Sequence, residues 1–151
     1  MKKMTVQFCW IDPEQNSDLE LPRYHSALAA GLDVSAAVCT PVVLNPGRID
    51  LLPSGFSVAI PEGYELQVRP RSGMAIRHGV TVVNSPGTID ADYRGEVRIG
   101  LINLGQEPFI IHRGDRIAQL VLAPVLRLQF EVVERLDTTS RADGGFGHTG
   151  K

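Results

Sequence analysis

Two carboxylates near the middle of the chain are the first residues that could do chemistry. In Asp90-Ala-Asp92-Tyr-Arg94-Gly95 they stand two positions apart, among glycines that favour a hairpin. The spacing begins like a calcium-binding loop, but Arg94 holds the fifth position and Leu101 the twelfth, where that loop needs a ligand and a glutamate. A carboxylate here could instead act as a general base toward a bound water, or it could be an ordinary solvated turn residue.

The glycine-rich end of the chain matches two phosphate-binding patterns. Gly145-Phe-Gly-His-Thr-Gly-Lys151 fits the P-loop spacing G-x-x-x-x-G-K and also the dinucleotide pattern G-x-G-x-x-G. Both motifs act at the start of a helix, and no helix-forming residues follow in this sequence, so we expect neither. Two interpretations stay open: a segment whose backbone N–H groups turn toward an anion, or a frayed tail.

Arginine dominates the basic residues. Lysine occurs only at positions 2, 3 and 151, and the rest of the 15 basic residues are arginine. A guanidinium group binds phosphate through two parallel hydrogen bonds, so such a composition suits a polyphosphate ligand, although codon usage can produce the same bias. Arg71 beside Ser72 could form a phosphate clamp, or a helix cap next to a surface charge. The four histidines lack metal-ligand spacing, so we expect no zinc site.

The elements that must position these residues are short strands. Fifteen glycines and ten prolines interrupt the chain, which favours strands and turns over helices. We expect strands at 42–44, 56–60, 65–69, 80–83, 97–99, 109–111, 117–122 and 126–132, of which the last alternates most strictly between apolar and polar residues. One short helix should have Ser72 as its N-cap, run through His78 and stop at Gly79. Strands separated by turns at this spacing predict an all-β sandwich or barrel.

Length and composition limit the class of protein. The 151 residues fit a single domain, which we divide into a β-domain at 1–137 and a flexible glycine-rich arm at 138–151. A net charge of −2 argues against a protein that coats nucleic acid, and no apolar run is long enough to span a membrane. No signal peptide is evident, and two cysteines make no disulfide framework, so we expect a cytoplasmic protein with reduced thiols.

Five segments, taken in order, resemble the five motifs of the trimeric deoxyuridine triphosphatases, the dUTPases. The resemblance runs from about Leu21 to Gly150, and its third and fifth segments are long and specific. The segments are Ala30-Gly-Leu-Asp33, Pro70-Arg-Ser-Gly73, Asn84-Ser-Pro-Gly-Thr-Ile-Asp90-Ala-Asp-Tyr93-Arg-Gly-Glu96, Gly114-Asp-Arg-Ile-Ala-Gln119 and Arg141-Ala-Asp-Gly-Gly-Phe146-Gly-His-Thr-Gly150.

The resemblance implies a homotrimer of distorted jelly-roll subunits with shared active sites. Its reaction would convert dUTP and water to dUMP and pyrophosphate with Mg²⁺, which keeps uracil out of DNA and supplies dUMP for thymidylate synthesis. Asp90 would be the general base, and Asp33 would lie near the metal only through water. The substrate contacts implied are Arg71, Ser72, Gly73 and Gln119 on the phosphates, Asn84 on uracil, Tyr93 under the sugar, and Arg141, Phe146 and Gly147 in the arm.

Two alternative functions remain to be tested. A dCTP deaminase shares this fold, but it is expected to lack both the complete segment 141–150 and the pairing of Asp90 with Tyr93. A regulatory module could use the nucleotide pocket only as a switch, and the intact Asp90 counts against this as its sole role. Release of pyrophosphate from dUTP separates the enzyme from the switch.

Overall fold

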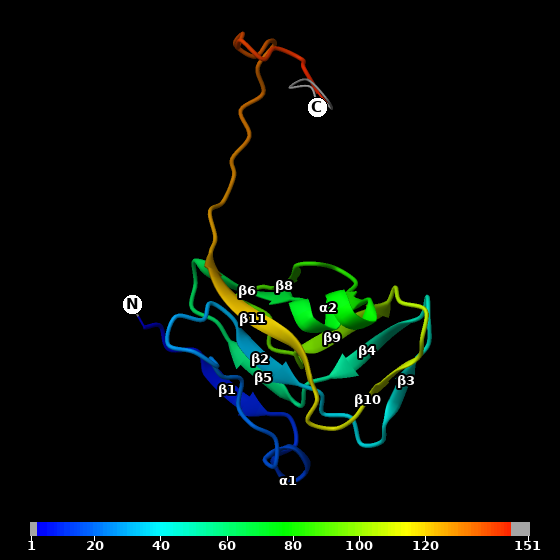
Figure 1. Ribbon diagram of the computed structural model, residues 1–151. Coiled ribbons are helices and arrows are strands. Elements are labelled where there is room, and N and C mark those ends of the chain that lie inside the picture. The colour runs from blue at the N-terminus through cyan, green and yellow to red at the C-terminus, as the bar shows by residue number, and fades with distance from the viewer. Residues whose placement is uncertain (1–2, 146–151) are drawn as a thin grey trace.

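The structure is a computed structural model that describes residues 3–145. Strands predominate, so the expected all-β class is confirmed (Figure 1). Phe146 and Gly147, expected in the arm, lie outside the described residues. No helix in residues 3–145 has the length and apolar character needed to cross a bilayer. The elements are β1 (Gln7–Trp10), α1 (Pro13–Asn16), β2 (Leu32–Ser35), β3 (Val42–Leu44), β4 (Ile49–Pro53), β5 (Phe56–Ala59), β6 (Tyr64–Arg69), α2 (Ser72–His78), β7 (Val80–Val82), β8 (Gly87–Ile89), β9 (Arg98–Asn103), β10 (Phe109–Ile111) and β11 (Arg116–Pro124).

The four-stranded sheet β2-β11-β6-β8 carries the candidate site residues Asp33 and Gln119. Its strands pair antiparallel, and Gln119 of β11 lies opposite Asp33 of β2 on one side and Arg69 of β6 on the other. Directly paired residues of antiparallel strands present their side chains on the same face, so these three polar side chains form a row. A second sheet, β4-β9-β7, and the strand pairs β1-β5 and β10-β3 complete the described strands.

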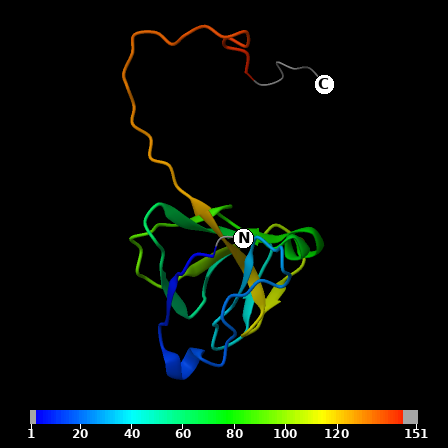
Figure 2. The ribbon, with the colours of Figure 1, turned by 90° about the vertical axis from the view of Figure 1, so that its left-hand side faces the viewer.

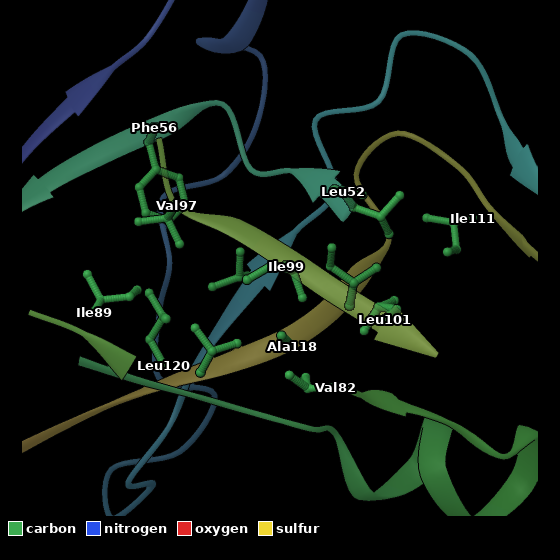
Figure 3. Packing of buried hydrophobic residues seen from close by; sticks show 14 of the residues in the cluster. Leu52, Phe56, Val82, Ile89, Val97, Ile99, Leu101, Ile111, Ala118 and Leu120 are labelled. Atoms are coloured by element: carbon green, nitrogen blue, oxygen red, sulfur yellow. The ribbon is translucent and has the colours of Figure 1, made fainter. Parts of the chain in front are cut away.

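Alternate residues of the two larger sheets point inward and form the apolar core. Figure 3 shows Leu52, Ile99 and Leu101 of one sheet beside Ala118 and Leu120 of β11. Ile99 and Leu101 are completely buried. Burying an aliphatic side chain of this size stabilises the folded state by about 1.5–3 kcal/mol. The core therefore fixes β11 firmly, and the other face of this strand can present polar residues to a cleft.

The helix α2 begins one residue earlier than the sequence predicts, because Ser72 was expected as the N-cap. Arg71 is the N-cap, in extended conformation and without a side-chain capping hydrogen bond, and Ser72 is the first helical residue. The predicted C-terminal stop is correct: Gly79 has a φ of 69° and its N–H bonds back to the Ala75 and Met74 carbonyls. Glycine adopts this left-handed conformation without strain, which explains the abrupt end of the helix.

The segment predicted as the clearest strand, 126–132, is not a strand in this structure. β11 ends at Pro124, and the chain beyond it leaves the β-domain as an extended segment (Figures 1 and 2). The apolar side chains of this segment are open to solvent, with Leu126 92%, Phe130 87% and Val132 98% exposed. The alternation implies one buried face, and within the described part of a single chain no strand pairs with this segment to cover that face.

The N-terminal segment contains a second helix, which the expectation of one short helix omitted. Asp12 caps α1 by accepting hydrogen bonds from the backbone N–H groups of Glu14 and Gln15, and Pro13 occupies the first position. These are favourable helix-start residues, but the helix is only one turn long. The preceding strand, β1, pairs antiparallel with β5 and so joins the N-terminal segment to the β-domain.

Arg113 fastens this N-terminal segment to the turn before β11. Its Nε and Nη2 donate to the two carboxylate oxygens of Asp18 at 3.0 and 2.7 Å, and Nη2 also lies 3.3 Å from Oδ1 of Asn16. The hydrogen bond from Arg113 lowers the pKa of Asp18 below its ordinary 3.8. The same bond raises the pKa of Arg113. The ion pair therefore holds together two segments that are distant in sequence.

Candidate active site

The Asp33 carboxylate, at the β2 end of the row of polar side chains, is surrounded by a cluster of basic side chains. Its Oδ2 lies 3.1 Å from Nη1 of Arg116, 3.4 Å from Nε of Arg71 and 3.5 Å from Nε2 of His25. The side chain of Asp33 is 16% exposed. A half-buried carboxylate needs partners of this kind, and in return it fixes the direction of both guanidinium groups.

The start of α2 borders the same cluster. Arg71 Nη1 donates to the backbone oxygen of Arg116 at 2.7 Å, which ties the N-cap to β11. Ser72 and Gly73 follow as the first two helical residues. Backbone N–H groups in the first turn of a helix have no intrahelical acceptor, so those of Ser72 and Gly73 can donate to an anion.

Gln119 completes this cleft from β11. Its Nε2 donates to the backbone oxygen of Pro70 at 2.9 Å, so the amide is held toward the start of α2. The cleft has a volume of about 540 Å³, and Arg69, Arg71 and Arg116 line it together with Asp33 and Gln119. Three arginines against one carboxylate leave an excess of positive charge, which suits a polyphosphate. The structure thus brings together the predicted residues Asp33, Arg71 and Gln119.

Asp90 lies in a different cleft. It follows the last residue of β8, is exposed, and lines a space of about 720 Å³ with Asp92, Glu65 and Arg94. Tyr64 and Glu65 of β6 border this cleft, whereas Arg69 at the other end of β6 borders the basic cleft. Five residue steps of a strand span roughly 16 Å. Within one chain, therefore, Asp90 lies in a different cleft from Arg69, Arg71 and Arg116.

Asn84 and Tyr93 flank β8 on the same segment as Asp90 but line neither cleft. The Asn84 side chain lies close to Gly87, where an added Cβ would be 3.1 Å from its Nδ2. Tyr93 donates its hydroxyl hydrogen to the Glu96 backbone oxygen at 3.0 Å and remains 46% exposed. Tyr93 is thus held by local backbone, and both side chains are exposed and can be reached by a ligand.

Arg141 lies in the C-terminal segment, away from both clefts. Its Nε donates to the backbone oxygen of Gly144 at 2.9 Å, within a local turn. Figure 2 shows this segment extending far from the β-domain. The predicted contacts Phe146 and Gly147 belong to residues that the structure does not describe.

The carboxylates in residues 3–145 form no preassembled metal cage. No group of three or more His, Cys, Asp or Glu side chains in that range is placed to hold a metal ion. All three basic contacts of Asp33 go to Oδ2, which leaves Oδ1 to accept a hydrogen bond from a water. Mg²⁺ keeps several waters and is often bound through substrate phosphates, so one carboxylate of this kind fits an indirect role.

Sequence reasoning missed three basic residues of the basic cleft, Arg69, Arg116 and His25. Arg116 lies inside the fourth motif segment, three positions before Gln119, a separation that regular alternation assigns to opposite faces of a strand. A register shift between Arg116 and Ala118 interrupts that alternation, and no sequence pattern marked it. His25 precedes the first motif segment, and no pattern in the sequence marks it. Its place beside Asp33 becomes visible only through the fold.

Comparisons with known proteins agree with one another. A family model described as dUTPase matches residues 17–150. The deoxyuridine 5'-triphosphate nucleotidohydrolase of Desulfotalea psychrophila is 59% identical over 145 residues, which cover 96% of this chain and 97% of that protein. The dUTPase of Staphylococcus bacteriophage 80alpha, solved with dUPNHPP, superimposes with a TM-score of 0.86 at 25% identity, over 99% of this chain and 100% of the phage chain. A mutant dUTPase from phage phi11 of S. aureus gives a TM-score of 0.76 at 24% identity, over 87% and 98% of the two chains.

Proposed function

The chain belongs to the dUTPase family and is a dUTP diphosphatase, and from this premise we propose how its two clefts divide the reaction. The proposal rests chiefly on the basic cleft, in which Arg71, Arg116 and Gln119 converge around Asp33 at the start of α2. Hydrolysis of dUTP to dUMP and pyrophosphate needs a site for three phosphates. An arginine-lined cleft beside free backbone N–H groups supplies that site.

We assign the phosphates to the basic cleft. Arg71 and the first turn of α2, Ser72 and Gly73, bind the phosphate chain, and the Gln119 amide donates to the α-phosphate. These donors face the oxygens on which negative charge spreads as the phosphoryl group transfers. They position the substrate and stabilise the transition state without themselves exchanging a proton.

Asp90 acts as the general base. It takes a proton from a water that attacks the α-phosphorus, the bond from that phosphorus to the bridging oxygen breaks, and pyrophosphate leaves. The exposure of Asp90 at the end of β8 supports this role, because a base for water must be open to solvent. On the same segment, Asn84 reads uracil, and Tyr93 packs under the deoxyribose, where a ribose 2'-hydroxyl has no room.

A complete site needs more than one chain, which supports the homotrimer. Asp90 and the phosphate residues occupy separate clefts of one subunit, so we propose that Asp90 of one chain faces the basic cleft of a neighbour. The exposed apolar side chains of segment 126–132 are further surface that a neighbouring subunit can cover. The arm follows this segment, so Arg141 and Phe146 of a third chain can close over the phosphates and the uracil.

Mg²⁺ is the metal that fits these residues. Asp33 would contact it through water at Oδ1, and the substrate phosphates would provide its direct ligands. When bound, the ion would neutralise negative charge on the phosphate oxygens. The mutant phi11 phage dUTPase that this fold resembles is described with a structural Mg(II) ion.

In the cell, this reaction would keep uracil out of DNA and provide dUMP for thymidylate synthesis. We place the protein in the cytoplasm, where its two free cysteines, Cys9 and Cys39, would stay reduced. The 59% identity to a curated dUTPase favours this function over dCTP deamination.

Turnover of competing nucleotides tests the proposal. Purified protein is incubated with dUTP, UTP or dCTP and Mg²⁺, and the products are separated by chromatography while pyrophosphate is measured. We expect dUMP and pyrophosphate from dUTP, and little reaction with the other two. Formation of dUTP or dUMP from dCTP would favour a deaminase, and removal of Mg²⁺ by EDTA without any loss of rate would exclude the metal's role.

A further inference from the structure

We propose that His25 is a positioning residue for the phosphate cleft: it holds the Arg116 guanidinium in place before the nucleotide arrives, and so sets the affinity for the polyphosphate. The inference rests on the assignment of this cleft to the phosphates. His25 lies outside all five motif segments, and the reaction as derived above does not use it.

Three side chains form a closed triangle at this cleft. Nε2 of His25 lies 3.3 Å from Nη1 of Arg116 and 3.5 Å from Oδ2 of Asp33. The same Nη1 donates to the same Oδ2 at 3.1 Å. His25 therefore reaches the cleft from the segment before β2 and meets a guanidinium that is already bound to Asp33.

The chemistry of the guanidinium decides what His25 does. Arginine has five N–H donors and no acceptor, so the contact is a hydrogen bond only when Nε2 of His25 accepts it. The imidazole proton then sits on Nδ1, and Nε2 cannot also donate to Asp33 at 3.5 Å, which is beyond the usual hydrogen-bond range. His25 therefore acts on Arg116 and not on the carboxylate.

Arg116 is the arginine of this cluster that needs such a support. Its side chain is 47% exposed, whereas that of Arg71 is 27% exposed and is held by the Arg116 backbone oxygen. A long exposed side chain loses rotamer freedom when it binds a ligand, and prior ordering reduces that loss. Two anchors, Asp33 and His25, keep the guanidinium in the cleft. The gain applies equally to bound substrate and transition state, so it lowers KM and leaves kcat unchanged.

Variants of His25 in the full-length protein test this role. His25→Ala should raise KM for dUTP about threefold at unchanged kcat, the effect of one partly exposed hydrogen bond to a charge. Inhibition by inorganic pyrophosphate should weaken by the same factor. His25→Gln, whose amide oxygen reaches as far as Nε2, should restore KM, whereas the shorter His25→Asn should not. His78→Gln is the matched control, since His78 packs against Phe109 at a ring distance of 5.0 Å and lines neither cleft.

A double-mutant cycle identifies Arg116 as the partner. In an Arg116→Met background, His25→Ala should have no further effect on KM, because the hydrogen bond is already absent. Full additivity of the two changes would overturn the proposal. So would a His25→Ala variant with unchanged KM, or one whose kcat and unfolding temperature fall while KM stays constant, which indicates a purely structural role.

Arg71→Gln separates this inference from the cleft assignment on which it rests. If Arg71→Gln raises KM and His25→Ala does not, the phosphate cleft stands and the role of His25 is wrong. If neither change affects KM or pyrophosphate inhibition, the phosphates bind elsewhere and both conclusions fail.

Discussion

The Gln119 side chain occupies the space that any side chain on Gly31 would need. A Cβ at position 31 would overlap Oε1 of Gln119 and would lie 3.0 Å from its Cδ and 3.2 Å from its Cβ. The amide cannot move aside freely, because its Nε2 donates to the Pro70 backbone oxygen at 2.9 Å. Glycine at position 31 therefore allows Gln119 to point toward the start of α2.

Gly31→Ala should displace the Gln119 amide and impair catalysis. A displacement of about 1 Å in a positioning group can cost on the order of a hundredfold in rate, so we expect kcat/KM for dUTP to fall by about that factor. Steady-state kinetics and the unfolding temperature are measured together. Leu28→Ala, an 85% exposed position in the same segment, is the control and should stay near wild type. Full activity of Gly31→Ala would show that Gln119 adapts or does not contribute.

Asp90→Asn should keep nucleotide affinity within a few-fold and remove most of the hydrolysis. The amide matches the carboxylate in size but cannot take a proton from water, and the loss of a general base typically costs about a hundredfold to ten-thousandfold in rate. Binding is measured by calorimetry with a non-hydrolysable dUTP analogue, and turnover by release of pyrophosphate. Asp92→Asn, two residues away in the same cleft, serves as the matched control. Wild-type turnover by Asp90→Asn would exclude the general-base role.

Local sequence patterns predicted several elements but not their partners. The alternation in 65–69 and 117–122 correctly indicated β6 and β11. Nothing local indicated that Gln119 pairs with Asp33 on one side and Arg69 on the other, because strand register depends on contacts between distant segments. Four strands were not predicted, β1, β2, β4 and β8. Each has five residues or fewer, and β8 begins at a glycine that is typical of a turn.

The same holds for the site: some of its residues were identified from the sequence, and others only from the fold. The resemblance to the dUTPase motifs indicated Asp33, Arg71 and Gln119, which the structure brings into one cleft, but it did not indicate His25. The strand predicted at 126–132 was wrong for a single chain, because alternation shows that one face is to be covered and does not show which chain covers it. In the single chain, Leu126 and Phe130 are accordingly exposed to solvent.

Tyr93→Ala should admit UTP. In the proposed site the Tyr93 ring packs under the sugar, so its removal should narrow the ratio of dUTP to UTP turnover, chiefly by improving the turnover of UTP. Tyr93→Phe is the matched variant, since it keeps the ring and loses only the hydrogen bond to the Glu96 oxygen. We expect it to retain sugar discrimination. Competition kinetics with both nucleotides provide the ratio, and unchanged rejection of UTP by Tyr93→Ala would place the sugar contact elsewhere.

The ion pair between Asp18 and Arg113 should make stability depend on pH in the acid range. The hydrogen bond from Arg113 lowers the pKa of Asp18 in the folded state below 3.8. The stabilisation is therefore fully present above pH 3.8 and disappears as the pH falls through the lower, folded-state pKa. Asp18→Asn should be less stable than wild type at pH 7, and the difference should vanish in strong acid.

Denaturant unfolding at several pH values, followed by the fluorescence of Trp10 in β1, measures this difference. Glu20→Gln removes a pair with Arg23 that is mostly exposed, and so provides a control with little effect. A gap between wild type and Asp18→Asn that stays constant down to pH 2 would contradict the linkage.

The arm should serve an active site that contains residues of other subunits. It follows the extended segment that leaves the β-domain after Pro124 (Figure 1), and about 14 residues of extended chain can reach roughly 45 Å. In a three-fold ring of head-to-tail contacts, every chain can give its arm to one neighbour and receive one from the other. Two inactive proteins test this arrangement: Asp90→Asn with its arm intact, and a wild-type β-domain truncated before Arg141.

The two proteins are unfolded, mixed in equal amounts and refolded together. About three quarters of randomly assembled trimers then contain both proteins. In each of these mixed rings, taken in one direction, one subunit with Asp90 is followed by a subunit with an arm. One site in three is therefore complete in each mixed trimer, and about a quarter of wild-type activity should return if sites act independently. The wild-type protein taken through the same refolding gives the reference rate. An arm that folds back onto the Asp90 cleft of its own chain leaves every site defective, so the absence of activity at all mixing ratios would contradict the exchange.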